Sequence, residues 1–191
     1  MRTEKSPGAF DRLAVGALLA CLAAVCPSQT PPSVPIEYHL KAAFLYNFAK
    51  FVDWPPGALG DPGEPMILGI LGKDPFGPTL EQTIRNKTVQ GRPLVIRRSD
   101  NFQELKHCHI LFISASERRR LPPVLRDLGK AAVLTVGEAE HFTQLGGIIN
   151  FTVEQSKIRF EISVDNAERS GLRISSQLLR LARIVRAAPG G

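Results

Sequence analysis

The strongest constraint on the fold is a series of short apolar runs that alternate with segments able to form helices. The runs occupy residues 66–71, 94–96, 108–113, 132–136 and 147–153. Several are apolar throughout, which is typical of strands that are covered on both faces. The alternation predicts an α/β fold, with a largely parallel sheet of about five or six strands and helices on both faces.

The last third of the chain departs from this alternation. The polar stretch 153–157 predicts a turn before the alternating segment 158–162, so residues 147–162 are predicted to form a C-terminal antiparallel hairpin on the sheet. A final helix is predicted from Ser163 or Asp165 to Val185, open to interruption near Ser170 and Gly171. The other predicted helices cover residues 78–85, 102–106, 116–128 and 138–143.

Residues 1–28 have the order of a signal peptide. Basic residues at positions 2, 5 and 12 precede an apolar run over 13–26, which is followed by Pro27 and small polar residues. A membrane-spanning helix needs about 20 apolar residues, so this run favours cleavage, near Cys26-Pro27-Ser28, over a retained anchor. We therefore expect a periplasmic protein. A lipoprotein attached through Cys21 is the alternative.

The remaining chain predicts one domain. Residues 29–35 are rich in proline and predict a linker, 36–186 a single α/β domain, and 187–191 a flexible tail. Cys108 is the only cysteine outside the signal, so no internal disulfide is expected, and its apolar neighbours predict an inert buried thiol. The formal net charge is +6. In an exported protein this favours an anionic envelope surface or an acidic protein over nucleic acid.

The first helix is predicted to begin near Ile36 and to carry two different faces. Its apolar positions follow at steps of four, four and three, and are predicted to pack on the sheet: Leu40, Phe44, Phe48 and Phe51. The Trp54-Pro55 pair ends the helix. The other side is predicted to form a partner or dimer interface, because aromatic residues are enriched at protein interfaces. The predicted interface residues are Tyr46, Asn47, Lys50 and Trp54.

A ligand pocket is predicted where the strands end, because ligands of open α/β sheets bind at the carboxyl ends of strands. The loop 72–77 follows the first run, but it has neither a dinucleotide-binding spacing nor a P-loop, and a helix-capping turn is its alternative interpretation. The residues predicted to line the pocket are Lys73, Asp74, Phe76, Ser114, Ser116, Gly137 and Glu138.

No catalytic, cofactor or metal site is predicted. His107 and His109 would share one face of a strand, but zinc needs three or four converging ligands. The sequence has no nucleophile elbow, and Cys108 lies inside an apolar run. The residues therefore favour a binding protein. A periplasmic small-molecule binding protein and an exported hydrolase are the alternatives.

Six blocks of the sequence together resemble the YfiR family of periplasmic proteins. In order, over about residues 36–186, they are YHLKAAFLYNFAKFVDWP, ILGKDPFG, CHILFIS, LTVGEAEHF, GGIINF and IRFEISVDNAERSGLRISSQLLRLARIV. The resemblance implies an exported α/β protein that is often a homodimer and is not an enzyme. It also implies a signalling regulator that binds the periplasmic domain of an inner-membrane diguanylate cyclase or sensor protein, represses cyclic-di-GMP synthesis and so limits biofilm formation.

The sequence departs from this family at its cysteines. Some relatives carry paired cysteines, including one in the first strand, whereas residues 66–71 here contain none. The resemblance therefore does not extend redox control to this chain, in which Cys108 has no evident partner.

Overall fold

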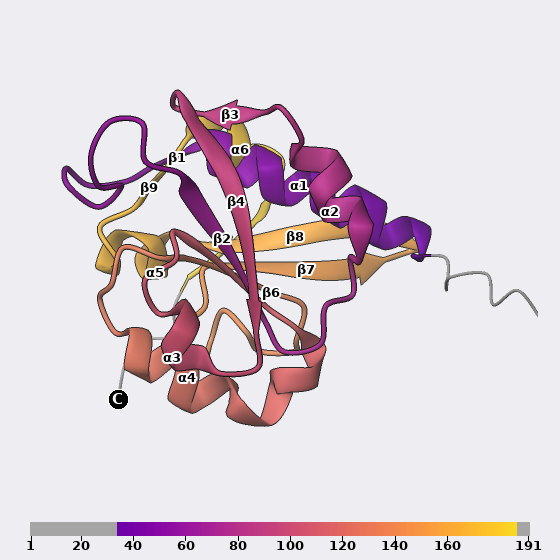
Figure 1. Ribbon diagram of the computed structural model, residues 1–191. Helices are drawn as coiled ribbons and strands as arrows, with labels where there is room; N and C mark the ends of the chain where they lie inside the picture. Colours follow the sequence, from indigo (N-terminus) through magenta and orange to yellow (C-terminus); the bar gives the residue numbers. More distant parts are fainter. Residues whose placement is uncertain (1–33, 187–191) are drawn as a thin grey trace, which may run out of the picture. The chain divides into compact units, whose positions relative to one another are not determined.

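A computed structural model describes residues 34–186. The predicted signal peptide, most of the predicted linker and the predicted tail lie outside these residues. The central feature is an eight-stranded sheet with the order β10-β8-β7-β6-β5-β2-β4-β3 (Figure 1). Its strands are β2 (Met66–Leu71), β3 (Thr88–Val89), β4 (Arg92–Ser99), β5 (Ile110–Ile113), β6 (Leu134–Gly137), β7 (Ile149–Glu154), β8 (Lys157–Ser163) and β10 (Arg183–Val185).

The predicted fold class is confirmed. Strands β4, β2, β5, β6 and β7 run parallel, and β7 and β8 form the antiparallel hairpin. The six longer strands match the predicted number, and the short strands β3 and β10 extend the sheet at its two edges. A separate two-stranded ribbon pairs β1 (Val52–Asp53) with β9 (Arg173–Ile174).

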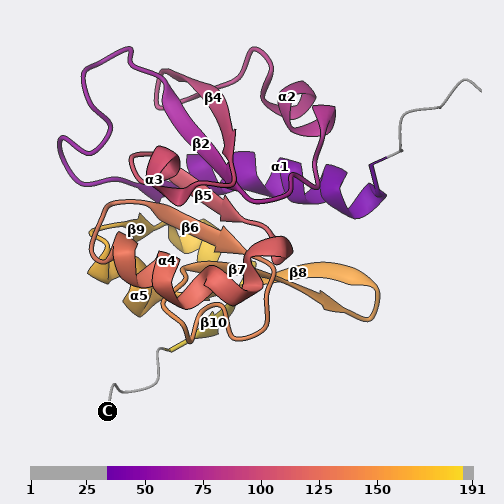
Figure 2. The same ribbon diagram turned by 60° about the horizontal axis from the view of Figure 1, so that its bottom comes forward.

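Helices cover both faces of the sheet (Figure 2). They are α1 (Ile36–Lys50), α2 (Pro78–Ile84), α3 (Phe102–Leu105), the 3₁₀ helix η1 (Ala115–Arg120), α4 (Leu121–Leu128), α5 (Val164–Arg169) and α6 (Ser176–Leu179). Buried residues of α1 and α2 join one core cluster, and those of α3 and α4 join the other. In β2, Leu68 and Ile70 belong to the first cluster while Leu71 belongs to the second, which explains why the strand is apolar throughout. Within residues 34–186, no helix is both long and apolar enough to cross a membrane.

The predicted core face of α1 is partly wrong. Phe48 is buried, and the Phe44 ring centre lies 5.9 Å from that of Phe48. The ring centre of Phe160 lies 5.3 Å from that of Phe44 and 5.0 Å from that of Phe48. Leu40, however, is 45% exposed, because it borders an open groove beside the β7–β8 hairpin instead of lying under the sheet. The buried positions of the helix are Lys41, Ala42, Leu45, Phe48 and Ala49.

The predicted final helix ends at the interruption expected near Ser170 and Gly171, and the prediction is wrong beyond that point. Ser163 caps α5 as expected, accepting a hydrogen bond from the backbone N–H of Asn166. The chain then turns at Gly171, whose φ of 72° is costly for other residues. The next elements are β9, α6 and β10 instead of a continuing helix, because pairing with β1 and β8 gives this segment a place in both sheets.

The predicted helix over residues 138–143 is replaced by turns. Phe142, from this segment, is completely buried, and its ring fills the space beside Gly137 and Gly147. His141 adopts a left-handed φ of 62°, which a helix would not allow. Burial of one aromatic ring thus outweighs helix formation in this short segment.

Candidate functional site

The residues predicted to line a ligand pocket lie together at the carboxyl ends of β2, β5 and β6. These three strands are neighbours, since β5 pairs with β2 on one side and with β6 on the other. Two hydrogen bonds join the loops that follow them. The Lys73 backbone N–H donates to Ser116 Oγ over 3.0 Å, and the Ala115 N–H donates to Glu138 over 3.4 Å.

Most of the predicted pocket residues already have contact partners within the protein. Asp74 accepts the Phe76 backbone N–H at 2.8 Å and pairs with Arg98 at 2.7 Å. Phe76 is fully buried, with its ring centre 4.8 Å from that of Phe112. Ser114 caps η1, and the Phe142 ring lies against Gly137. A ligand pocket at this edge stays a prediction, and it requires these contacts to open.

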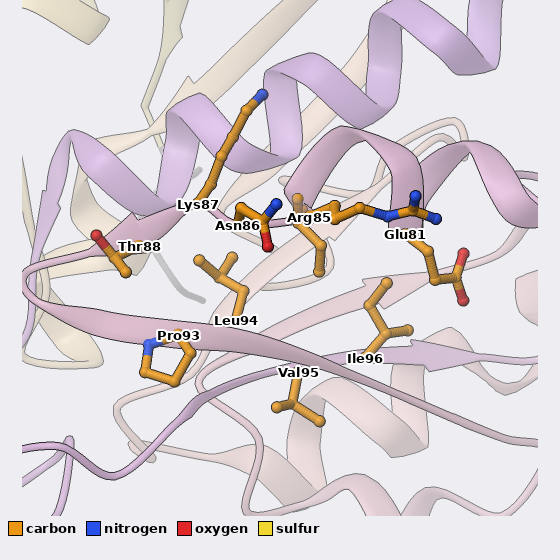
Figure 3. Close-up of a pocket in the computed structure, with 10 residues that line it drawn as sticks. Glu81, Arg85, Asn86, Lys87, Thr88, Pro93, Leu94, Val95 and Ile96 are labelled. Carbon is orange, nitrogen blue, oxygen red and sulfur yellow. The ribbon is translucent and has the colours of Figure 1, made fainter.

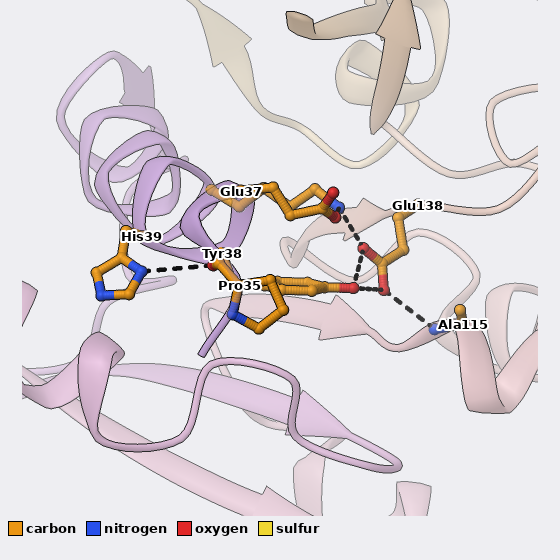
Figure 4. Close-up of polar contacts among 7 residues, drawn as sticks. Pro35, Glu37, Tyr38, His39, Ala115 and Glu138 are labelled. Carbon is orange, nitrogen blue, oxygen red and sulfur yellow. Dashed lines mark hydrogen bonds and ion pairs between the residues drawn. The ribbon is translucent and has the colours of Figure 1, made fainter. Parts of the chain in front are cut away.

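An ion-pair cluster that the sequence did not reveal crosses from α1 to the end of β6 (Figure 4). Lys41 is 4% exposed, and its Nζ lies 2.7 Å from Glu138 and 2.8 Å from Glu37. The Tyr38 hydroxyl donates to Glu138 over 3.3 Å. Glu138 therefore holds a lysine, a tyrosine and the Ala115 backbone N–H in one place. The i, i+4 spacing of Glu37 and Lys41 is visible in the sequence, but nothing in it signals that Lys41 is buried.

This cluster is a structural connection. Burial acts to lower the pKa of Lys41, but hydrogen bonds to Glu138 and Glu37 outweigh it, so the pKa is raised above its ordinary value. Burial also raises the pKa of Tyr38, and the Glu138 charge adds to the effect. Both groups therefore keep their protons at neutral pH, and neither is poised to exchange one in catalysis.

The predicted interface residue Tyr46 lies between two lysines. Its ring centre is 5.5 Å from Nζ of Lys50, on the same helix, and 4.7 Å from Nζ of Lys87, in the segment before β3. The Tyr46 hydroxyl donates to the Thr88 carbonyl oxygen over 3.4 Å. We call the patch formed by Tyr46, Lys50 and Lys87 the Tyr46 surface. Asn47 is half-buried, and its backbone carbonyl accepts the Phe51 N–H at the end of α1.

Trp54 directly follows β1 and precedes Pro55. Its ring is partly buried against the core, and its Nε1 is a buried donor with no hydrogen-bond partner in residues 34–186. The Gln90 side chain, in the turn between β3 and β4, donates to the Val52 carbonyl oxygen over 3.3 Å. Tyr46 therefore contacts the β3–β4 hairpin at Thr88, and β1, which precedes Trp54, contacts it through Gln90.

The residues around Cys108 have structural roles. Cys108 lies just before β5, not inside a strand, and burial raises the pKa of its thiol to about 12. His109 Nδ1 accepts the backbone N–H of Ile67 over 2.8 Å, so this ring is neutral. Burial lowers the pKa of His109, and the positive charge of Arg92 adds to the effect. No group of three or more His, Cys, Asp or Glu side chains in the described part of the chain could hold a metal ion.

Two of the larger cavities lie away from the strand ends. A groove of about 950 Å³ separates the start of α1 from the tip of the β7–β8 hairpin, and exposed Ile36 and Val153 are among its lining residues. A cavity of about 590 Å³ lies between α2 and β4, beside Leu94 and Ile96 (Figure 3). Lys87 and Thr88 also line this second cavity, so it adjoins the Tyr46 surface.

Comparison with known protein families gives a match over most of the described residues. The model of a family described as YfiR/HmsC-like matches residues 38–183. The matched segment runs from the first turn of α1 to the start of β10. It therefore includes the Tyr46 surface, Trp54, the strand ends and all residues that line the two cavities except Ile36 and Glu37.

Proposed function

The chain belongs to the YfiR/HmsC-like family, and from that premise we propose that it is an exported protein that represses a membrane-bound diguanylate cyclase by binding the cyclase's periplasmic domain. At the level of the family, membership supports a periplasmic regulator of diguanylate cyclase that acts in cyclic-di-GMP signalling and biofilm formation. Export through residues 1–28, direct binding to the cyclase and formation of a homodimer are parts of the proposal.

The observation that carries the proposal is the Tyr46 surface. A partly exposed tyrosine flanked by Lys50 and Lys87 combines an aromatic contact area with positive charge. Aromatic residues supply much of the binding energy at protein interfaces, and a positive patch selects an acidic partner surface. The formal net charge of +6 acts in the same direction.

The polar groups at the strand ends support binding over hydrolysis. Glu138 accepts hydrogen bonds from Lys41, Tyr38 and Ala115, and Asp74 is paired with Arg98. These carboxylates stabilise the connections between helices and strands. The same arrangement supports a rigid α1 on which the exposed side of the helix can be presented to a partner.

The proposal is tested by capturing the partner. The tagged mature chain, residues 29–191, is incubated with detergent-solubilised envelope, and bound proteins are identified by mass spectrometry. We expect a membrane diguanylate cyclase to be recovered by the wild type. Tyr46→Ala and Trp54→Ala should each weaken binding to the purified periplasmic domain about tenfold or more. Arg126→Ala, at an exposed position on α4, is the matched control.

Two results would contradict different parts of the proposal. Recovery of the chain alone, with no membrane signalling protein, would count against the function. Recovery of a cyclase that binds both variants as tightly as the wild type, with dimerisation also unchanged, would count against the Tyr46 surface and Trp54 as the interface. Addition of the pure chain to the reconstituted cyclase should lower cyclic-di-GMP synthesis.

A further inference from the structure

Strand β4 has a neighbour along only one side for most of its length. It pairs with β2 from Leu94 to Ser99, whereas β3 pairs with it only at Arg92 and Pro93. Asn86, just before β3, adopts a left-handed φ of 58°, and residues 85–87 are not paired with β4. Over residues 94–98 no strand of the described chain pairs with the outer side of β4, which we call the β4 edge.

The two edges of the sheet differ in length. β10, at the opposite edge, has three residues, and short edge strands are one way in which proteins avoid pairing with other chains. β4 has eight residues, of which β3 covers two. An uncovered edge of this length presents backbone N–H and C=O groups to which an extended segment can add as a further strand.

A cavity runs along the β4 edge. It has a volume of about 590 Å³ and is lined by the end of α2, by segment 85–88 and by residues 93–96. Figure 3 places Leu94 between β4 and α2, with segment 85–88 running opposite β4. Val95 is 42% exposed. The edge therefore offers apolar contacts for side chains as well as backbone groups.

The charges around the β4 edge select an acidic occupant. Arg85, Lys87 and Arg97 are exposed and have no carboxylate within ion-pairing distance among residues 34–186. Arg98, by contrast, is paired with two carboxylates, Asp74 and Glu81, and Glu81 also lines the cavity. A second copy of the chain would bring the same basic side chains to this edge, and like charges across paired strands are unfavourable.

We propose that the β4 edge binds an extended acidic segment of a partner protein, which adds to the sheet as a further strand alongside residues 94–98 of β4, past the end of β3. This inference rests on the proposed function and deepens it, because it names the chemistry of the partner segment. The Tyr46 surface continues the same site, since Lys87 lies over the Tyr46 ring and the Tyr46 hydroxyl reaches Thr88. Strand addition supplies backbone hydrogen bonds, and the basic side chains supply selection by charge.

The test uses a fluorescent probe peptide of eight alternating glutamate and valine residues, whose binding to the mature chain is measured by fluorescence anisotropy at low salt. A probe with lysine in place of glutamate tests charge. A probe with N-methylated valines keeps the charge but removes backbone donors. We expect each of these changes to weaken binding about tenfold or more, because the site needs both the charges and the strand.

Variants of the protein provide the second arm. Arg85→Glu combined with Arg97→Glu should weaken binding of the acidic probe about tenfold. Arg119→Glu combined with Arg126→Glu makes the same change of charge at exposed positions of η1 and α4, and should leave binding within about twofold. Absence of probe binding, equal binding of the N-methylated probe, or an equal loss in the control variant would each overturn the proposal.

Capture of the cyclase separates this inference from the proposed function. If the Arg85→Glu, Arg97→Glu variant still binds the cyclase like the wild type, the β4 edge is not the docking site, although the function stands. If the probe binds as expected but no cyclase is captured, the function fails while the edge stands as a binding site. A dimer of the chain that the acidic probe dissociates would assign the edge to a second copy and overturn the proposal.

Discussion

Lys41, on α1, and Glu138, at the end of β6, form an ion pair of 2.7 Å whose side chains are 4% and 8% exposed. This pair connects the first helix to the middle of the sheet. Tyr46 follows Lys41 by five residues, so it projects from another side of the same helix. The position of the proposed interface therefore depends on a contact in the interior.

Removing Glu138 should be costly. In Glu138→Gln the buried Lys41 loses its charged partner, although Glu37 remains, and we expect a loss of about 3 kcal/mol in the free energy of unfolding. Urea denaturation measures this change. Lys41→Met combined with Glu138→Leu removes both charges and should be much closer to the wild type. If the double variant is less stable than Glu138→Gln, the attraction within the ion pair exceeds the free-energy cost of burying the two charges.

Trp54 should tolerate phenylalanine better than alanine. The buried Nε1 donor has no partner in the described chain, so Trp54→Phe removes an unsatisfied group while keeping an aromatic ring. We expect a change within about 1 kcal/mol for Trp54→Phe and a loss of about 3 kcal/mol for Trp54→Ala. A loss clearly larger than about 1 kcal/mol for Trp54→Phe would contradict this expectation. Comparing partner binding by both variants then separates interface effects from folding.

The Cys108 thiol should be unreactive in the folded protein. Its pKa is raised to about 12 by burial, so almost no thiolate forms at pH 8, and iodoacetamide should label the mature chain only after unfolding in guanidinium. Rapid labelling without denaturant would contradict this. Because the unfolded thiol ionises first, stability should fall from about pH 9 towards pH 12, by at most about 1.4 kcal/mol per pH unit. Cys108→Ala should lack that contribution.

His109 should make the protein less stable in mild acid. Its neutral ring accepts the Ile67 N–H, and burial lowers its pKa below the unfolded value of 6.5. As the pH falls below 6.5, the unfolded chain takes up a proton first, so the free energy of unfolding should decrease until the folded pKa is reached. Urea denaturation between pH 7 and pH 5 measures the slope. His109→Asn should flatten it, whereas His107→Asn, at an exposed position, should not.

Phe142 and its two glycines should behave as one unit. A Cβ at either Gly137 or Gly147 would overlap the Phe142 ring, so Gly147→Ala should destabilise the protein by about 1–3 kcal/mol. Phe142→Leu, which replaces the ring with a smaller side chain, should recover part of that loss in the double variant. Thermal or urea denaturation of the four proteins gives the coupling. Strict additivity would show that the glycines do not contact the ring in solution.

The sequence predicted those parts of the fold that depend on local pattern. The apolar run 66–71 has the bounds of β2, and the hairpin and α2 lie where turn residues and Pro78 indicated. The prediction for the C-terminal segment failed because the structure of this segment depends on pairing with residues more than a hundred positions away, as Ile174 pairs with Val52. The sequence pattern of residues 163–185 is compatible with a helix, and it does not reveal that β1 needs a partner strand from this segment.

The site was less predictable than the fold. Position at the strand ends brought Lys73, Ser116 and Glu138 into one region, as the α/β rule indicates. The sequence could not show that Glu138 is bound to Lys41, because burial of a lysine depends on a carboxylate almost a hundred residues away. The β4 edge also escaped notice, since an unpaired side of a strand leaves no trace in the strand's own residues.

The ribbon of β1 and β9 bears on how this protein is made. Val52 lies among the first residues of the described domain, and its partner Ile174 lies close to the end. During synthesis α1 is complete long before β9 is available to pair with β1. Contacts between residues that are distant in the sequence form late in folding. A chain emerging from a ribosome or a translocation pore would lack this ribbon until β9 had been released. A chain that ended before β9 would leave β1, and Trp54 beside it, without the partner strand.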